Sequence, residues 1–197
     1  MQSLIPSEAR TASLERSTGE TSIKLSVNLD GQGQYQVDTG NGFLDHMVGQ
    51  LARHGLFDIT LEAKGDVHVG WHHLVEDTAI MLGRAFREAL GEPRGIRRMG
   101  HAIVPLDETL VMVALDFSGR GYAVVETTLN EVMVETLSGD LIQHFLEAFA
   151  IEGRINLHAK VLAGVSPHHK AEALFKALAR ALRDAIEPDP RAAGQVP

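Results

Sequence analysis

A short histidine motif occurs twice in this chain of 197 residues, and it constrains the fold more than any other feature. Two adjacent histidines are followed, three residues after the second, by a glutamate; the motif begins at His72 and again at His168. A lone histidine, His46 or His144, precedes each copy by a similar interval. One such motif is commonly a set of surface residues, but two matched copies indicate a duplication with two related half-sites. Because histidine and carboxylate together bind transition metals, the duplication predicts a metalloenzyme.

The hydrophobic pattern around the two motifs also has a common order. A strand–strand–helix–strand–helix unit occurs twice, about 95 residues apart. The predicted strands are 21–29, 35–37, 57–61, 111–117, 122–128 and 155–162, and the predicted helices are 43–53, 72–90, 140–151 and 168–186. Turn-forming residues at 30–33 and 118–121 predict that the second strand of each half returns beside the first.

This repeated order predicts one duplicated α+β domain over residues 1–197, with repeats at about 10–93 and 94–187. A unit this small would not bury its helix faces alone, so we expect the halves to pack helix layer against helix layer. We expect residues 1–10 to form a loose arm. The tail after Glu187, rich in Pro, Gly and Ala, is expected to be mobile.

Composition restricts the class of protein. Apolar residues make up 44% of the chain and charged residues 22%, as in ordinary globular domains. The formal net charge of −8 argues against a nucleic-acid partner. The absence of cysteine excludes disulfides and thiolate metal sites. No apolar run approaches the ~20 residues of a membrane span, and the start of the chain lacks a hydrophobic signal core, so we expect a cytoplasmic protein without a membrane partner.

Helix geometry suggests how the motif residues divide between two ions. Adjacent helical residues project about 100° apart, whereas residues three or four apart share a face. His73 and Glu76 can therefore share one ion, while His72 reaches a second, and the same argument applies to the other motif. The predicted ligand sets are His46, His73, Glu76 and His168 for one ion, and His72, His144, His169 and Glu172 for the other.

This mixture of nitrogen and oxygen ligands suits Mn, Fe, Co, Ni or Zn better than Mg or Ca. The remaining histidines with no such partners, namely His54, His68, His101 and His158, are predicted to be structural or solvated. Asp77 either orients a metal ligand or is a solvated helix acid.

Several sequence runs resemble one enzyme family. They are GFLDHM at 42–47, QLARHG at 50–55, GDVH at 65–68, the two histidine motifs with Asp77, PLDE at 105–108, DFSGR at 116–120 and FKA at 175–177. Over about residues 10–191 the chain resembles the imidazoleglycerol-phosphate dehydratases. The resemblance implies a carbon–oxygen lyase of histidine biosynthesis that converts D-erythro-imidazole glycerol phosphate into imidazole acetol phosphate. It also implies two manganese ions per active site, bound to the imidazolate ring of the substrate.

The same resemblance implies an architecture. It is an α+β fold, ribosomal protein S5 domain 2-like, with two four-stranded sheets each backed by two helices. It further implies a homo-oligomer of 24 subunits built from trimers, with active sites between subunits.

Roles for individual residues come from the resemblance as well. Glu20 matches a glutamate that approaches the substrate, and it serves either as an acid/base residue or only to position the substrate. Glu172 shares proton transfer while binding metal. Arg98 and Arg120 match phosphate-binding arginines, and Lys176 matches a lysine of the site; arginine suits phosphate through its bidentate fork.

Two other functions fit the histidine motifs alone. A metal-dependent hydrolase would use the paired ions to activate water, but the chain lacks bridging aspartates and a motif that positions a nucleophile. A metal-binding structural or storage protein would use the histidines only to join subunits. Turnover of substrate distinguishes these alternatives from the dehydratase.

Overall fold

The computed structural model describes residues 9–192 and residue 195, and it contains two four-stranded sheets. The first sheet has the order β1-β2-β4-β3, from β1 (Thr11–Ser17), β2 (Thr21–Asn28), β4 (Asp58–Gly65) and β3 (Tyr35–Asp38). The second has the order β5-β6-β10-β7, from β5 (Met99–Leu106), β6 (Thr109–Asp116), β10 (Asn156–Ala163) and β7 (Tyr122–Glu126). A short hairpin of β8 (Met133–Val134) and β9 (Leu137–Ser138) follows β7.

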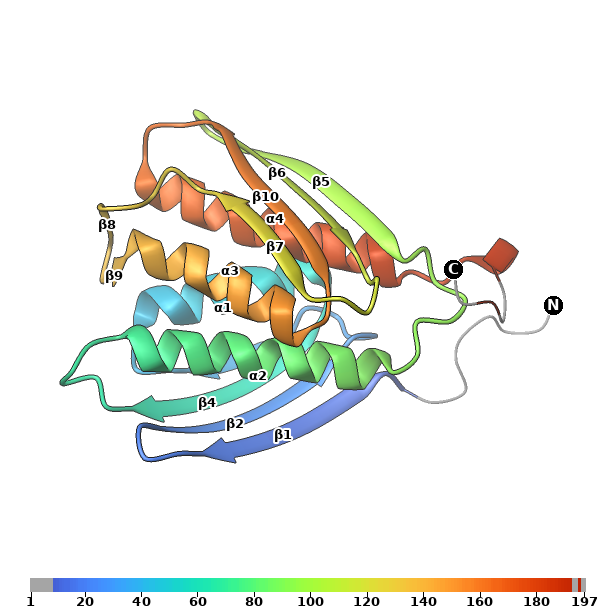
Figure 1. The fold of residues 1–197 in the computed structure, drawn as a ribbon, viewed down its shortest axis with the longest axis horizontal. Helices are drawn as coiled ribbons and strands as arrows, with labels where there is room; N and C mark the ends of the chain where they lie inside the picture. Colours follow the sequence, from blue (N-terminus) through green and yellow to red (C-terminus); the bar gives the residue numbers. More distant parts are fainter. Residues whose placement is uncertain (1–8, 193–194, 196–197) are drawn as a thin grey trace.

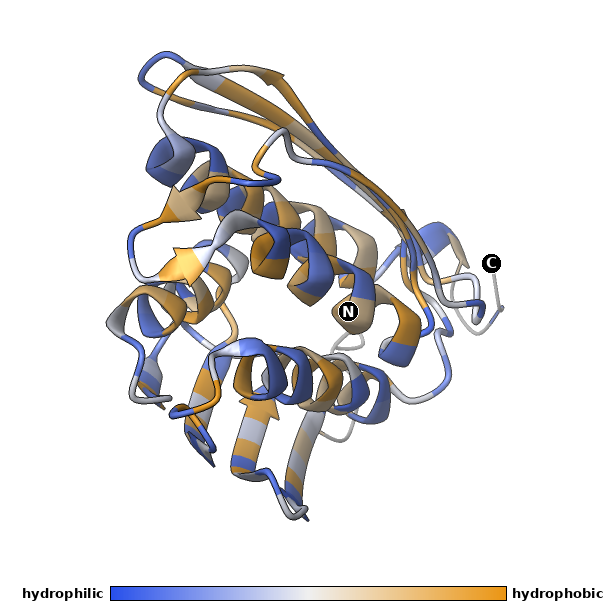
Figure 2. Ribbon diagram, turned by 60° about the vertical axis from the view of Figure 1, so that its left-hand side comes forward, coloured by the Kyte–Doolittle hydropathy of each residue, from blue (hydrophilic) through white to orange (hydrophobic). Residues whose placement is uncertain are grey.

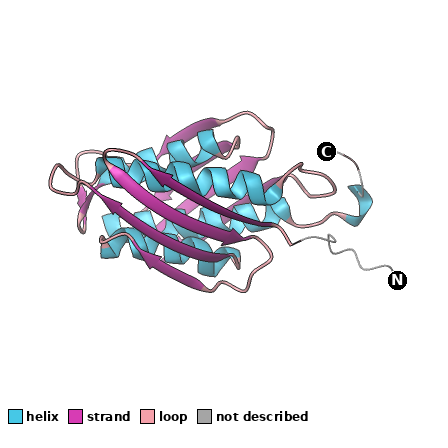
Figure 3. Ribbon diagram, turned by 90° about the horizontal axis from the view of Figure 1, so that it is seen from below, coloured by secondary structure: helices cyan, strands magenta, loops and turns pink. Residues whose placement is uncertain are grey.

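Four helices lie between the two sheets, as Figures 1 and 3 show. They are α1 (Gly42–Gly55), α2 (His72–Leu90), α3 (Gly139–Glu152) and α4 (Pro167–Ile186). Helices α1 and α2 cover the first sheet, and α3 and α4 cover the second. Helix α1 packs against α4, and α2 packs against α3. The predicted α+β fold, with two helices behind each sheet and helix layers in contact, is confirmed.

The predicted pairing of neighbouring strands is wrong in both halves. Strand β3 does not return beside β2; it pairs with β4 in the parallel direction, and β4 lies between them. Strand β7 likewise pairs in parallel with β10 and does not contact β6 as a hairpin partner. Parallel neighbours need a crossover connection, and α1 and α3 supply these crossovers. The turn residues therefore end a strand without forming a tight hairpin.

One strand in each sheet was not predicted from the hydrophobic pattern. Strand β1 is an edge strand whose side chains are only partly buried, so its alternation is weak. The inward-facing residues of β5 are small because α4 packs closely against it. A Cβ atom at Gly100 would lie 2.1 Å from the carbonyl oxygen of Ala181. Small inward residues reduce the hydrophobic signal that identifies a strand.

One continuous core includes residues of both repeats. In the first sheet, hydrophobic residues alternate with hydrophilic ones along the strands, and the hydrophobic ones face the helices (Figure 2). Between the helix layers the ring of Phe86 on α2 lies 5.4 Å from that of Phe149 on α3, centroid to centroid. Within the second layer, Phe145 on α3 packs against Phe175 on α4 at 5.0 Å. Aromatic contacts therefore join helices both within a layer and between the layers, which fixes the relative position of the histidines they carry.

The ends of the described chain are tied to each other. Arg10 donates a hydrogen bond to the carbonyl oxygen of Ile186, and Asp189 donates one to that of Gly95. Residues Pro190–Ala192 form a 3-10 turn. The predicted loose arm falls mainly on residues 1–8, and the predicted mobile tail partly on 193–194 and 196–197, all outside the described residues. None of the helices in the described part is both long enough and apolar enough to cross a membrane.

Candidate metal centre

The two histidine motifs begin helices α2 and α4. Ser166 caps α4 by accepting a hydrogen bond from the backbone N–H of His169, and Pro167 occupies the first turn. Proline at this position costs no hydrogen bond because the first helical N–H groups have no partner inside the helix. Capping thus fixes where the helix starts, and with it the direction of the two histidines.

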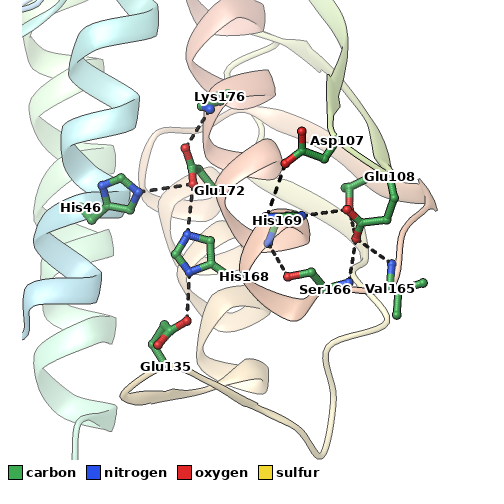
Figure 4. A network of polar contacts seen from close by, with 11 residues as sticks. His46, Asp107, Glu108, Glu135, Val165, Ser166, His168, His169, Glu172 and Lys176 are labelled. Carbon is green, nitrogen blue, oxygen red and sulfur yellow. Dashed lines mark hydrogen bonds and ion pairs between the residues drawn. The ribbon is translucent and has the colours of Figure 1, made fainter.

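One candidate cluster, called the α1–α4 cluster, consists of His46, His168 and Glu172, drawn in Figure 4. Oε2 of Glu172 lies 3.4 Å from Nε2 of His46 and 3.2 Å from Nε2 of His168. Oε1 of the same carboxylate accepts a hydrogen bond of 2.7 Å from Nζ of Lys176. Burial alone would raise the pKa of Glu172, but the hydrogen bonds from Lys176 and His46 outweigh it and leave that pKa below its usual value. Glu172 is therefore held in its charged form, which is the form that binds a metal.

The second candidate cluster, called the α2–α3 cluster, consists of His72, Glu76 and His144. The imidazole rings of His72 and His144 are stacked with centroids 4.9 Å apart. Nε2 of His144 is buried and lies 3.2 Å from Oε1 of Glu76, yet the geometry is not that of a hydrogen bond, and the nitrogen has no hydrogen-bond partner among the described residues. A buried ring nitrogen without a partner is costly, and a metal ion bound at this position would remove that cost.

Each cluster combines both repeats and differs in its members from the predicted ligand sets. His46 lies with His168, and His72 lies with His144, but each glutamate lies in the cluster that the prediction assigned to the other one. The ligand pairs on one helix are spaced four residues apart, His72 with Glu76 and His168 with Glu172, where a spacing of three was predicted. The exchange follows from the helix packing, because α1 lies against α4 and α2 lies against α3.

His73 and His169 do not join either cluster within the described chain, contrary to the predicted sets. Nδ1 of His73 lies 3.1 Å from the carboxylate of Asp66, and Nδ1 of His169 lies 2.7 Å from Oε2 of Glu108 (Figure 4). These hydrogen bonds raise the pKa of each histidine above its usual value. Both rings are thus oriented by a carboxylate, as metal-bound histidines commonly are.

Glu20 and Glu108 hold equivalent places in the two repeats, each directly before the buried threonine that begins β2 or β6. The carboxylate of Glu108 accepts hydrogen bonds from the backbone N–H groups of Val165 and Ser166 and contacts His169, which together lower its pKa strongly. The carboxylate of Glu20 accepts no hydrogen bond within the described residues, and its nearest ionic partner is Nδ1 of His73 at 3.9 Å.

The structure also shows supporting residues that the sequence did not identify as such. Gln50 lies one helical turn from His46 and one from His54, with its amide 3.3 Å from Nδ1 of His46 and 3.1 Å from Nε2 of His54. Oε1 of Glu135, in the β8–β9 turn, lies 3.1 Å from Nδ1 of His168. The spacing of four between residues 46, 50 and 54 is a signal that sequence reasoning could have used; Glu135 has no local signal, because only the fold brings it to His168.

Arg98 and Arg120 lie at the end of the folded domain that is opposite to both clusters. The backbone N–H of Arg98 donates to the carbonyl of Ala185 near the end of α4, and His168 lies at its start. At 1.5 Å per residue the two ends of this helix segment are about 25 Å apart. The Arg98 guanidinium is bound by both oxygens of Asp116, and Arg120 is exposed in the β6–β7 turn. Lys176, in contrast, lies beside the α1–α4 cluster and contacts Glu172.

Known proteins of similar sequence carry a single family name. The family model described as imidazoleglycerol-phosphate dehydratase matches residues 39–182. The chain is 58% identical over 188 residues to the imidazoleglycerol-phosphate dehydratase of Dehalococcoides mccartyi, covering 95% of this chain and 94% of that protein. It is 55% identical over 193 residues to that of a Roseiflexus species, covering 98% and 97%.

Two solved structures have the same fold. The imidazoleglycerol-phosphate dehydratase of Staphylococcus aureus superposes with a TM-score of 0.81 at 32% identity, covering 90% of this chain and 99% of that one. The enzyme from Pyrococcus furiosus superposes with a TM-score of 0.79 at 35% identity, covering 91% and 96%.

Proposed function

The chain belongs to the imidazoleglycerol-phosphate dehydratase family, and from this premise we propose that it converts D-erythro-imidazole glycerol phosphate into imidazole acetol phosphate with two bound metal ions. As a family member it is a carbon–oxygen lyase of histidine biosynthesis. The observation that carries the metal proposal is the presence of two equivalent clusters, each with two histidines and one glutamate whose donor atoms lie within 4.8 Å of one another. We further propose a cytoplasmic location.

The donor set fits manganese. Each cluster offers two imidazole nitrogens and a carboxylate, and Nε2 of His144, which has no hydrogen-bond partner in the described part of the chain, is an atom that a cation would bind. His46, His168 and Glu172 would hold one ion, and His72, Glu76 and His144 the other. Bound there, the two ions would supply Lewis acidity to the imidazole ring of the substrate.

His73 and His169 are proposed to complete clusters of neighbouring subunits. Each has its Nδ1 held by a carboxylate, Asp66 or Glu108, which leaves Nε2 as the ligand atom. Since neither joins a cluster of its own chain, a second copy is the partner that would use it. The active sites would then lie between subunits, as the resemblance implies.

Dehydration removes the hydroxyl from the carbon next to the ring and a proton from the following carbon, and the resulting enol rearranges to the ketone. We assign the acceptance of that proton to the Glu20 carboxylate, which is 57% exposed and bound by no hydrogen bond from the described residues. Lys176 holds Oε1 of Glu172 and keeps an ammonium group beside the α1–α4 cluster. Glu172 would share in proton transfer there.

Arg98 and Arg120 are proposed to bind the substrate phosphate at the active site of a neighbouring subunit. In its own chain Arg98 lies about 25 Å from the start of α4, by the helix rise, and Arg120 is exposed in the β6–β7 turn. The carboxylate of Asp116 orients the Arg98 guanidinium. Arginine binds phosphate through parallel N–H groups.

A homo-oligomer is also supported by the outer face of the second sheet. Met99, Ile103 and Tyr122 are each about three-fifths exposed on this sheet, and its strands are largely hydrophobic in Figure 2. The equivalent face of the first sheet carries two charged pairs, Glu15–Lys24 and Glu62–Lys64, whereas this face carries one, Lys160–Glu126. An exposed apolar face of this kind is typical of an interface. We propose that a second copy covers it, in an assembly of the 24-subunit type.

The test is turnover of imidazole glycerol phosphate by metal-stripped protein, with and without added manganese. We expect imidazole acetol phosphate to form only when manganese is present. Protein that binds manganese and assembles but forms no product would overturn the proposed reaction. Hydrolysis of a phosphate ester under the same conditions would favour the metal-dependent hydrolase.

A further inference from the structure

Asp77 follows the candidate ligand Glu76 directly but projects about 100° away from it around α2, toward the first sheet. Asp77 is only 7% exposed to solvent. One carboxylate oxygen is paired with the guanidinium of Arg16 on β1, and the other accepts a hydrogen bond from the hydroxyl of Thr21 on β2. Asp77 is therefore neither a solvated acid nor a direct partner of a metal ligand, which were the two alternatives left by the sequence.

The hydrogen bonds continue from Thr21 into the turn that carries Glu20. Because the Thr21 hydroxyl donates its proton to Asp77, the Thr18 hydroxyl, 3.3 Å away, is left to donate to Thr21. Oγ1 of Thr18 in turn accepts the backbone N–H groups of Glu20 and Thr21 at 3.1 and 3.0 Å. The carbonyl of Glu20 accepts the N–H of Asp66, in the segment that leads into α2. The turn is thus tied to α2 through Asp77 and to the segment before α2 through Asp66, while the Glu20 carboxylate accepts no hydrogen bond from the described residues.

The second repeat lacks this network. Arg16 pairs with Ile23 across β1 and β2, and the equivalent pair across β5 and β6 is Val104 with Val111. The residue after the second glutamate ligand is Ala173, which is buried. The fold of one repeat therefore stands with apolar residues at both positions. The second repeat instead fixes its equivalent glutamate, Glu108, by direct hydrogen bonds to the side chain.

Strong hydrogen bonds to a carboxylate lower its pKa and weaken it as a proton acceptor. The Glu20 carboxylate accepts none from the described residues, so the hydrogen bonds of the turn's backbone are what fix its position. We propose that Arg16, Asp77 and Thr21 are positioning residues that hold the Glu20 turn in place over the start of α2. This inference rests on the proposed function of Glu20 in the dehydration. A displacement of about 1 Å at such a group can reduce turnover about 100-fold.

A purely stabilising role makes a different prediction. Replacing a buried ion pair by apolar residues of suitable size is often neutral or stabilising, so stability alone does not require the network. The chain itself supplies the replacement, since Arg16→Val with Asp77→Ala copies the second repeat. Thr21→Val removes only the hydroxyl that links Asp77 to the turn, and Thr21→Ser keeps it.

We would compare wild type, the Arg16→Val/Asp77→Ala double variant, Thr21→Val and Thr21→Ser as manganese-loaded, assembled protein. The double variant and Thr21→Val are expected to bind wild-type amounts of manganese with little change in KM, and to lose about 10- to 100-fold in kcat. Thr21→Ser is expected to restore most of the rate. When Glu20 is already replaced by Gln, adding the two substitutions of the double variant should lower kcat further by less than about 3-fold. The reason is that the effects of residues acting through one another do not add. A double variant with wild-type kcat would overturn the inference. So would a double variant that lowers kcat by the same factor whether Glu20 is present or replaced by Gln.

Amide hydrogen exchange tests the turn itself, whatever the reaction turns out to be. Exchange at Glu20 and Thr21, whose N–H groups are bound by Thr18, is expected to rise at least about tenfold in both disruptive variants and to stay unchanged in the β5–β6 turn. Unchanged exchange at Glu20 would reject the positioning role. Wild-type protein without turnover would reject only the proposed function, and the exchange result would still decide the inference.

Discussion

Oε1 of Glu76 on helix α2 lies 3.2 Å from Nε2 of His144 on helix α3, although the two residues belong to different repeats of the chain. The other cluster is built in the same way, with His46 of the first repeat 3.4 Å from Glu172 of the second. Neither repeat can assemble a cluster alone. The duplication therefore yields two sites only because the helix layers of the two halves pack against each other.

Each glutamate ligand is expected to control one ion. Glu76→Gln and Glu172→Gln replace a charged ligand by a neutral, weaker one, so we expect each variant to retain about one manganese per chain and wild type to retain two. Metal analysis after dialysis measures this. Glu62→Gln, on the exposed outer face of the first sheet, is the control and should keep both ions. Two tightly bound ions in either ligand variant would contradict the assignment.

The hydrogen bond between Glu108 and His169 predicts a change in titration. This hydrogen bond is the main cause of the raised pKa of His169, with the nearby charges of Glu108 and Asp107 adding to it. In metal-free protein, Glu108→Gln should bring the pKa of His169 down, as followed by NMR of the ring protons. Manganese affinity should fall about 10- to 100-fold, since groups that orient metal-bound histidines have effects of this size. A His169 titration identical to that of wild type would show that Glu108 does not orient the ring.

An ion pair between Arg84 on α2 and Glu152 on α3 predicts how stability depends on pH. The hydrogen bond of 2.7 Å from Arg84 is the main cause that lowers the pKa of Glu152 in the folded state. A lowered folded-state pKa stabilises the protein above the unfolded value of about 4.5, and this stabilisation is lost as the pH falls through the folded-state value. Because the pair is partly exposed, we expect it to contribute less than about 1 kcal/mol. Urea unfolding from pH 7 to pH 3 should show a smaller loss for Glu152→Gln than for wild type, and equal losses would contradict this.

Gly83 is predicted to resist replacement by alanine. In an exposed helix, Gly→Ala stabilises by up to about 1 kcal/mol. At Gly83, however, an added Cβ would lie 2.5 Å from the carbonyl oxygen of Phe149 on α3. We therefore expect Gly83→Ala to destabilise by about 1–3 kcal/mol in urea unfolding, because the two helices must move apart. Gly42→Ala at the start of α1 has open space around it and is the control. A stabilised Gly83→Ala protein would show that the α2–α3 contact is looser than described.

The apolar outer face of the second sheet predicts a variant that fails to assemble. Ile103 occupies the place that Glu15 has in the first repeat, since they pair with Met112 and Lys24 at equivalent positions. Ile103→Glu should lower the mass of the assembly by placing a charge inside the proposed interface. Analytical ultracentrifugation measures this, with Lys24→Glu on the first sheet as the control. An assembly of unchanged mass would exclude this face as an interface.

The sequence by itself determined the duplication, the helices that carry the histidine motifs and the type of ligand. These depend on local periodicity and on residue chemistry, which are properties of short segments. The prediction failed for β1 and β5, where edge position and small inward residues weaken the pattern. It also failed for the order of strands, because β3 and β4 become neighbours only through the crossover helix α1.

Only the tertiary structure decided which residues share a cluster. His46 could join Glu76 of its own repeat or Glu172 of the other by spacing alone, and the packing of α1 against α4 selected Glu172. The tertiary structure also showed that Asp77 faces Arg16, and that His73 and His169 face carboxylates outside both clusters. These contacts join segments far apart in the chain. Their geometry depends on how two helix layers fit together, and a local pattern carries no information about that fit.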